Sequence, residues 1–447
     1  MPNPNVALIL DCSDSMKWSN YFVGAQTAQA TFVNVMRTND NVGLVGFSDT
    51  AWIFFPADGT SQLVPITGVS VQNQAVQAIQ NQTTHMLTNM TAAIATARGM
   101  LTSAAAPRAI VLLSDGYYTG VDPLINLPTD IPIHTVALGP ASDVGTLQQI
   151  AYLTCGQGLG YHYADNPFVM MKVYNMIVQS ANVAQNVVNN SATVANFQVL
   201  SVPMQIEPGQ SEARAAVTWT DPNTAYAPGP PVGAQVNVGL QDPNGATATP
   251  TTVTSGRGFV VMTVANPIAG AWQIGLWTAQ AGAAAGLQTV QGGFQPGGTA
   301  NLTLAFEGGG KVGSPAPFRA QVTHDGAPID NVRLMAVAEA PLVSVAQALK
   351  RHSRALAKMA VPSDGGAGAA SARLANLAKL HAQQPGGIMP RENYPVLLAP
   401  DGSGGHCGHL SRTDVPGPHS VHVVATGRSP VDGSPFRREA LLSVNIA

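Results

Sequence analysis

The end of the first predicted strand carries a cluster of side-chain oxygens, which constrains the fold more than any other feature of the sequence. Residues 6–10 are five apolar residues in succession, a run typical of a strand buried on both faces of a parallel sheet. Asp11, Ser13 and Ser15 follow directly. A carboxylate and two hydroxyls at alternate positions can converge on one point, where they offer the hard oxygen ligands that suit Mg²⁺ or Mn²⁺ better than Zn²⁺.

Two further oxygens occur in comparable positions later in the chain. Thr88 precedes Asn89 and a segment with helical periodicity. Asp115 comes soon after a second apolar run, residues 109–113, and is followed by Gly116. Each of these motifs alone is most often a helix cap or a turn. Their order and their common setting at strand ends favour a single binding site.

The five oxygen-bearing residues resemble the metal-ion-dependent adhesion site of von Willebrand factor A domains, where D-x-S-x-S is followed by T and then by D-G. The matching residues are Asp11, Ser13, Ser15, Thr88 and Asp115. The resemblance implies a Rossmann-like α/β domain that binds Mg²⁺, Mn²⁺ or Ca²⁺. It also implies a partner protein whose aspartate or glutamate completes the coordination of the ion. The two carboxylates would supply charge, and the neutral hydroxyls would leave the ion electrophilic.

Strand and helix patterns alternate through residues 1–190, as in a mostly parallel sheet covered by helices. Besides the two apolar runs, the predicted strands span residues 42–47, 52–55, 131–138 and 161–163. The predicted helices span residues 20–37, 71–82, 91–102, 144–153 and 168–183. Ligands of such sheets bind beyond the carboxyl ends of the strands, where Asp11 and Asp115 are placed.

The helical periodicity of the sequence ends near residue 195, which predicts a second domain over residues 195–295. Short alternating runs appear between turns rich in proline and asparagine, a pattern typical of a β-sandwich. The predicted strands span residues 213–219, 234–240, 258–264 and 272–277. Residues 217–219, 240–245 and 270–272 resemble the small β-domain that follows the A domain in hemicentins and calcium-activated chloride channel regulators.

A third domain, a second β-sandwich, is predicted over residues 296–447. Its predicted strands span residues 301–306, 316–323, 332–337, 394–398, 420–425 and 441–446. Residues 395–398, 401–405 and 417–419 resemble the immunoglobulin-like or fibronectin-like repeat of the channel regulators. The sequence departs from that repeat where a further acidic loop is expected, so the resemblance implies no calcium role for this domain.

Residues 341–387 are predicted to form a helical insert within the third domain. Apolar residues recur there at helical spacing on both sides of a glycine- and alanine-rich break, residues 362–370. The insert holds a single acid, Asp364, and six basic residues: Lys350, Arg351, Arg354, Lys358, Arg373 and Lys379. Two interpretations remain open, a solvated hairpin whose charges keep it soluble and a docking element for an acidic partner surface.

A second group of candidate ligands lies near the C-terminus. His406, Cys407 and His409, with His419 and His422 nearby in the sequence, could bring two or three transition-metal ligands together. The spacing does not complete a four-ligand zinc motif. A metal site and a set of unrelated surface histidines therefore both remain open.

The composition indicates a folded protein of about three domains. At 447 residues the chain is too long for one hydrophobic core, and its 45% of apolar residues is ample for folding. The formal charge of −3 gives no electrostatic footprint for nucleic acid. Cys12, Cys155 and Cys407 are too few and too scattered for a disulfide framework.

The sequence shows neither a membrane span nor a signal for the general secretory route. No apolar run approaches the roughly 20 residues of a membrane span, and residues 1–5 lead into the first strand without a basic region or a cleavage site. We therefore expect a chain that is cytoplasmic or is exported by a signal-independent route.

Two functions remain open. The first is a protein-binding or adhesion module in which a bound Mg²⁺ coordinates an acidic residue of a partner. The second is a structural subunit of a larger assembly, in which the ion staples the fold and the β-domains make the contacts. Catalysis is not expected, because the chain has no H-E-x-x-H, G-x-S-x-G, Walker A or dinucleotide-binding motif.

Overall fold

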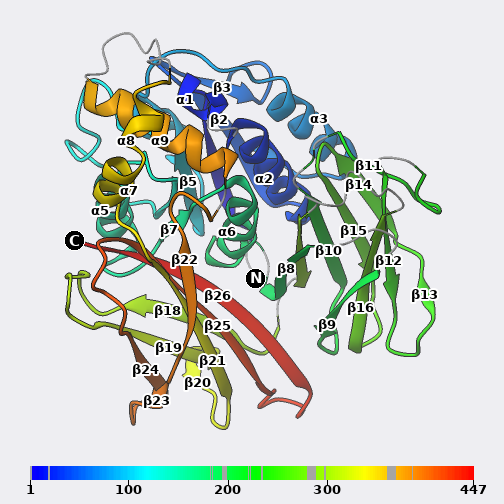
Figure 1. Cartoon of the computed structure of the whole chain (residues 1–447). Helices are drawn as coiled ribbons and strands as arrows, with labels where there is room; N and C mark the ends of the chain where they lie inside the picture. Colours follow the sequence, from blue (N-terminus) through cyan, green and yellow to red (C-terminus); the bar gives the residue numbers. More distant parts are fainter. Residues whose placement is uncertain are drawn as a thin grey trace.

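The protein is an α/β unit followed by a β-rich region with several sheets, which confirms the coarse order of domains expected from the sequence (Figure 1). The computed structural model describes residues 3–18, 21–181, 183, 185–193, 199–219, 221, 223–232, 235–278, 288–295, 298–359, 369–384 and 386–447. Within these residues no helix has both the length and the apolar character that crossing a bilayer would require.

The α/β unit is built on a seven-stranded sheet with the order β3-β2-β1-β5-β6-β7, in which β4 pairs with the edge of β2. The strands are β1 (Asn5–Asp11), β2 (Asn41–Phe47), β3 (Ala51–Phe55), β4 (Val64–Pro65), β5 (Arg108–Ser114), β6 (Ile133–Leu138) and β7 (Tyr161–Ala164). Strands β2, β1, β5, β6 and β7 are parallel, whereas β3 and β4 run antiparallel to β2. β1 is completely buried because helices cover both faces of the sheet.

Six helices belong to this unit and separate its core into two clusters. They are α1 (Asp14–Trp18), α2 (Tyr21–Val35), α3 (Val69–Gln80), α4 (Met90–Leu101), α5 (Val144–Cys155) and α6 (Pro167–Ser180). Apolar residues of α2, α3 and α6 form the core on one face of the sheet, and those of α4 and α5 form the core on the other face. Asn89 and Asp143 cap α4 and α5 with their side chains, which fixes where each helix begins.

The second unit consists of two five-stranded sheets with the orders β14-β15-β10-β17-β8 and β11-β12-β16-β9, the latter with β13 beside β12. Its strands are β8 (Gln185–Thr193), β9 (Val199–Ile206), β10 (Glu212–Trp219), β11 (Ala225–Tyr226), β12 (Gln235–Gln241), β13 (Thr247–Ala248), β14 (Thr252–Gly256), β15 (Phe259–Ala265), β16 (Gly270–Thr278) and β17 (Gln288–Gln295). Apolar side chains of both sheets share one core. The predicted boundary at residue 190 falls inside β8, which pairs with β17 of this unit.

The third unit also has two sheets around a common core, with the orders β18-β19-β24-β23 (with β20 beside β19) and β22-β21-β25-β26. Its strands are β18 (Asn301–Phe306), β19 (Ala316–His324), β20 (Ala327–Pro328), β21 (Arg333–Pro341), β22 (Arg391–Val396), β23 (Ala399–Pro400), β24 (Gly405–Leu410), β25 (Gly417–Arg428) and β26 (Pro435–Ile446). The expected strand at 394–398 is shifted, because β22 ends at Val396.

The insert between β21 and β22 is helical, as the sequence predicts. It contains α7 (Val345–Arg351), α8 (Ser353–Leu356) and α9 (Ala369–Gln383). Asp364 and most of the predicted glycine-rich break lie outside the described residues. The insert has a small core of its own, formed by Val343, Ala348, Leu356, Leu377, Ile388 and Met389. A reciprocal capping box between Ser344 and Gln347 begins α7.

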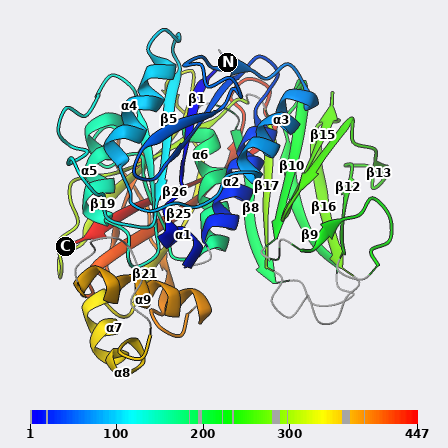
Figure 2. The same cartoon turned by 90° about the horizontal axis from the view of Figure 1, so that it is seen from above.

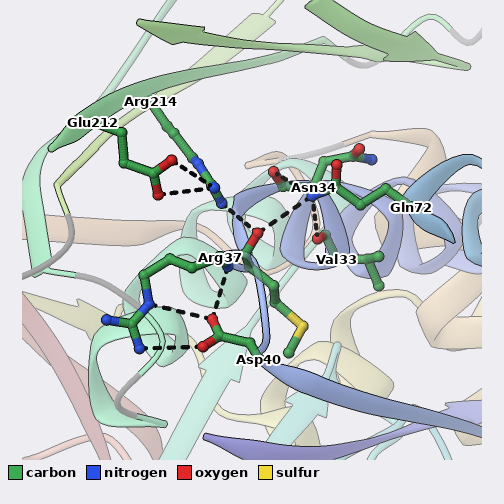
Figure 3. A network of polar contacts seen from close by, with 8 residues as sticks. Val33, Asn34, Arg37, Asp40, Gln72, Glu212 and Arg214 are labelled. Carbon is green, nitrogen blue, oxygen red and sulfur yellow. Dashed lines mark hydrogen bonds and ion pairs between the residues drawn. The ribbon is translucent and has the colours of Figure 1, made fainter. Parts of the chain in front are cut away.

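The second unit closes the carboxyl end of α2 (Figure 3). Arg214 of β10 pairs with Glu212 at 2.9 Å and donates a hydrogen bond to the carbonyl of Met36. Nε2 of Gln72 lies 3.3 Å from the carbonyl oxygens of Val33 and Asn34. The last carbonyls of a helix have no hydrogen-bond donor within that helix. Here side chains from α3 and β10 donate to them.

The third unit contacts both of the others. The hydroxyl of Ser443 accepts a hydrogen bond from the amide of Tyr163 at 3.0 Å, which joins β26 to β7. Arg438 of β26 is buried and forms an ion pair with Glu207 of the second unit. Unpaired charges are costly to bury, so this contact holds the two β units in a defined arrangement.

Candidate metal centre

The candidate site lies at the carboxyl edge of the central sheet because β1 and β5 are adjacent and parallel. Their register pairs Ile9 with Leu112. Asp11 is the last residue of β1, and Asp115 directly follows β5. Both carboxylates therefore leave the sheet at the same edge, where loops can close over a ligand.

Hydrogen bonds connect four of the five predicted residues into one chain. The amide of Ser13 donates to Oδ1 of Asp11 at 2.8 Å. The hydroxyls of Ser13 and Ser15 are 2.9 Å apart, and the hydroxyl of Ser15 donates to Oδ1 of Asp115 at 2.7 Å. The two carboxylates are thus connected through Ser13, by its amide and its hydroxyl, and through the hydroxyl of Ser15.

Thr88, the fifth predicted residue, faces the same place. A Cβ atom on Gly116 would lie 3.7 Å from Oγ of Ser15 and 3.8 Å from Oγ1 of Thr88, so both hydroxyls adjoin this glycine. Thr119 holds Thr88 in position, because its hydroxyl accepts from the Thr88 amide at 3.0 Å and its amide donates to the Thr88 carbonyl at 2.8 Å. The structure therefore brings all five predicted oxygens to one edge of the sheet.

Residues 6–117 match the family model described as von Willebrand factor type A domain. The N-terminal unit is a von Willebrand factor type A domain. No curated protein sequence matches this chain significantly.

The solved structures similar to this chain include the following three, all at low identity. A von Willebrand factor type A protein from Catenulispora acidiphila is 16% identical over 72% of this chain and 63% of its own, with a TM-score of 0.37. The ArnB paralog VWA2 from Sulfolobus acidocaldarius is 13% identical over 72% of this chain and 62% of its own, with a TM-score of 0.31. A DUF4785 family protein from Legionella pneumophila is 8% identical over 59% of this chain and 65% of its own, with a TM-score of 0.32. The chain thus spans less than two thirds of the length of each of them.

Two residues that support the site were not predicted. The hydroxyl of Ser114 donates to Oδ2 of Asp11 at 2.6 Å, and Thr119 fixes Thr88. Ser114 could have been found from its place as the last residue of β5, next to Asp115 and opposite the end of β1. Thr119 could not, because its contact with Thr88 depends on how two loops fold over each other.

The environment of Asp11 favours a bound cation. The side chain is fully buried, and burial raises the pKa of its carboxyl to about 6, while hydrogen bonds from Ser114 and Ser13 act in the opposite direction. The groups that lower this pKa are hydroxyls and amides, which carry no full charge to balance the carboxylate. A positive ion at this edge of the sheet would compensate for the desolvated charge.

The donor set fits a hard divalent ion. It consists of two carboxylates and three hydroxyls, so every side-chain ligand is an oxygen. In the part of the chain that the structure describes, no three His, Cys, Asp or Glu side chains are grouped to hold a metal, and this site contains only two residues of those types. Its remaining ligands would be the hydroxyls of Ser13, Ser15 and Thr88.

The C-terminal histidines have separate surroundings. Nδ1 and Nε2 of His419 are each 2.9 Å from a backbone carbonyl oxygen, those of Gly417 and Arg412. Nε2 of His422 is 2.9 Å from Oε2 of Glu439. His419 and His422 therefore have partners within β25, β26 and their loops, and among the described residues they do not join His406, Cys407 and His409 in a metal-binding group.

Proposed function

We propose that the protein captures a partner protein through a divalent cation held by its A domain, with Mg²⁺ as the expected ion. The observation that carries this proposal is the continuous hydrogen-bonded path from Asp11 through Ser13 and Ser15 to Asp115, with Thr88 beside it. These five side chains are preorganised for an ion, because the strand ends and the hydrogen bonds between them already hold their oxygens close together.

The residues of the site have distinct roles in this proposal. Asp11 and Asp115 provide the negative charge, and the hydroxyls of Ser13, Ser15 and Thr88 provide neutral oxygens. A bound Mg²⁺ would supply a Lewis-acidic position for a carboxylate of the partner. Three neutral ligands offset less of the ion's charge than carboxylates would, which favours an incoming aspartate or glutamate.

Exposed apolar side chains next to the site support a role in binding. Met86 and Leu87 directly precede Thr88 in sequence and are 47% and 39% exposed. Tyr117 follows Gly116 and is 51% exposed. Large apolar groups exposed beside a polar centre are typical of contact surfaces, in which a partner covers them.

We propose that this chain is not an enzyme. We further propose that the second and third units are immunoglobulin-like or fibronectin-like modules, similar to those of hemicentins and chloride channel regulators. Two sheets around one core in each unit support this assignment.

The test uses random peptides displayed on phage and selected on the immobilised full chain in Mg²⁺, with elution by chelator. We expect the eluted peptides to share an aspartate or glutamate, and we expect changing that residue to asparagine or glutamine to abolish binding. Selection on the Asp115→Ala variant is the control and should yield no chelator-eluted peptides. Enriched peptides that lack an acid, or that bind equally in chelator, would overturn the proposal.

The alternative function, a structural subunit with the ion as a fold staple, is favoured by the buried contacts between the units. Arg438 and Glu207 form a completely buried ion pair across the two β units, as expected of parts that do not move separately. This alternative demands that chelator lower the melting temperature strongly while no carboxylate ligand depends on the metal. A bound ion raises the melting temperature under either function, so calorimetry has to be combined with the peptide binding measured in Mg²⁺ and in chelator to separate the two.

A further inference from the structure

We propose that the described part of the helical insert, with α7, α8 and α9, forms a basic flank of the metal site and binds an acidic segment of the same partner whose carboxylate reaches that site. This inference rests on the proposed function and adds the chemistry of the partner. The occupant is a protein segment with several aspartates or glutamates close to the coordinating one.

The insert contacts the same end of the A domain as the metal site. Its helix α9 contacts α1, the short helix that contains Ser15. His381 of α9 is buried, and its Nε2 is 3.8 Å from Oδ2 of Asp165, which directly follows β7 at the same edge of the sheet. Figure 2 shows β1 leading to α1 at one end of the A domain and the three insert helices continuing beyond that end. A partner that reaches the site would therefore meet the insert.

The basic side chains of the insert are available to a partner. All six are exposed, and none belongs to an ion pair within the described part of the chain: Lys350, Arg351, Arg354, Lys358, Arg373 and Lys379. The arginines elsewhere contrast with them. Most are paired with a carboxylate, namely Arg37, Arg98, Arg108, Arg214, Arg319, Arg391, Arg412, Arg437 and Arg438.

Lys17 extends the basic surface toward the site. It is exposed on α1, two residues after Ser15, and has no ion pair among the described residues.

The formal charge of the chain is divided unevenly between the insert and the rest. Six basic residues and one acid give the insert a formal charge of +5, so the rest of the chain carries −8 of the total of −3. Within the described part of the chain, the unpaired cations are thus concentrated in the insert, whose helix α9 contacts α1, rather than spread evenly over the chain.

The insert presents these charges on an ordered support. Leu356 and Leu377 are buried in the core of the insert itself, and the Ser344–Gln347 capping box fixes the start of α7. Helices held in this way lose little further conformational entropy when a partner binds. A larger share of the electrostatic attraction therefore contributes to the affinity. A hairpin that served only for solubility would need neither its own core nor a contact with α1.

The experiment compares two fluorescent peptides that carry one central glutamate. In one the flanking residues are serine and glycine, and in the other they are aspartate and glutamate. Binding to the full chain is measured by anisotropy in Mg²⁺ at low and high salt. We expect the acidic peptide to bind roughly tenfold or more tightly at 50 mM salt, with the preference shrinking at about 0.5 M because salt screens exposed charges.

The insert variant is Lys350→Gln, Arg351→Gln, Arg354→Gln and Lys358→Gln together. Its matched control is Arg257→Gln, Lys311→Gln, Arg333→Gln and Arg428→Gln, which removes the same charge from exposed positions on the β units. The insert variant should lose the preference for the acidic peptide and keep its affinity for Mg²⁺. The control should keep both. Circular dichroism verifies that each variant is folded.

The remaining outcomes separate this inference from the proposed function. If binding needs Mg²⁺ but the insert variant retains the preference, the basic flank is overturned and the metal-dependent module stands. If the acidic peptide binds equally in chelator and to Asp11→Ala, the proposed function and its coupling to the insert both fail. If the control loses the preference as fully as the insert variant, the effect is one of net charge and the flank is overturned.

Discussion

Ser114 donates a hydrogen bond of 2.6 Å to Oδ2 of Asp11, which joins the ends of two neighbouring parallel strands at the candidate metal centre. Both side chains are completely buried. The amide of Ser13 donates to the other oxygen, Oδ1, at 2.8 Å. The carboxylate is thus held from both sides, and its orientation is set before any ligand arrives.

Removing this hydroxyl should weaken the site. Ser114→Ala leaves Oδ2 of Asp11 without its donor, so we expect Mg²⁺ affinity to fall several-fold and stability to fall by about 2 kcal/mol. Ser142→Ala is a matched control, because Ser142 is also buried and donates to the carbonyl of Gly139 at 2.8 Å. The control should lose stability and bind Mg²⁺ normally by calorimetry. Equal Mg²⁺ affinity in both variants would mean that Ser114 does not position Asp11.

The five oxygens should differ in importance. Asp11→Ala and Asp115→Ala remove charge that water cannot replace, so we expect no measurable Mg²⁺ binding while the A domain remains folded. Ser13→Ala and Thr88→Ala should weaken binding roughly tenfold, or about 1.4 kcal/mol, because water can occupy the place of a neutral oxygen. Isothermal titration measures both. Parent-like binding by the two aspartate variants would show that the ion lies elsewhere.

The contact between β10 and the end of α2 should be important for stability. Arg214→Gln leaves Glu212 without its partner and removes the donor to the carbonyl of Met36, so we expect a loss of roughly 3 kcal/mol. Arg98→Gln is the comparison, because Arg98 pairs with Asp130 at 3.2 Å while about half exposed, and such pairs contribute about 0–1 kcal/mol. Urea unfolding followed by fluorescence should show an earlier first transition for Arg214→Gln only.

Stability should fall as the solution becomes mildly acidic. Burial lowers the pKa of His134 to about 4. The pKa of His162 is lowered to about 3, first by burial and also by repulsion from the charge of His134. Between pH 6.5 and about 4 the unfolded chain therefore binds protons that the folded chain does not. The free energy of unfolding should then decrease, and each histidine contributes a slope that approaches about 1.4 kcal/mol per pH unit. Burial raises the pKa of Asp11 to about 6, so Asp11 gains a proton in the folded chain over the same range and offsets part of this slope.

Replacing one of these histidines tests that reason. Neither ring nitrogen of His162 has a hydrogen-bond partner in the described structure, so His162→Phe should remove the proton linkage without losing a bond. We expect this variant to unfold with a flatter pH dependence between pH 6.5 and 4, as measured in urea. His409→Phe, at an exposed position, should retain the slope of the parent. A parent-like slope in His162→Phe would assign the acid sensitivity to other groups.

The positions of the five candidate oxygens follow from the sequence because local rules determine the strands and turns that carry them, whereas their binding of a metal stays a prediction. Residues 6–10 and 109–113 are continuous apolar runs, as buried parallel strands require, and the oxygens follow where those strands end. β8 (Gln185–Thr193) and β17 (Gln288–Gln295) were not predicted, because β8 is mostly polar and β17 has two glycines among polar residues. They acquire their strand structure by pairing with each other, and β17 also pairs with β10. The contact of α9 with α1 was also beyond prediction, since nothing local in residues 341–387 indicates which surface they meet.

The insert should be removable without loss of the fold. β21 and β22 pair up to Pro341 and Arg391, so the insert leaves from the end of a regular antiparallel pair. The sequence left open whether Leu349, Leu356 and Leu377 would pack on the sandwich. Leu356 and Leu377 are instead buried in the core of the insert, against which Leu349 also packs.

We therefore expect an Asn-Gly turn in place of residues 342–390 to leave the two strands paired, because such a turn suits a two-residue hairpin. This replacement also removes Ile388 and Met389, which would otherwise be exposed with the rest of the core gone. The shortened protein should stay soluble and melt within a few degrees of the parent. It should bind Mg²⁺ with the parent's affinity and show no preference for the acidic peptide. Aggregation, or an expanded form in size-exclusion chromatography, would mean that the insert covers an apolar surface of the A domain.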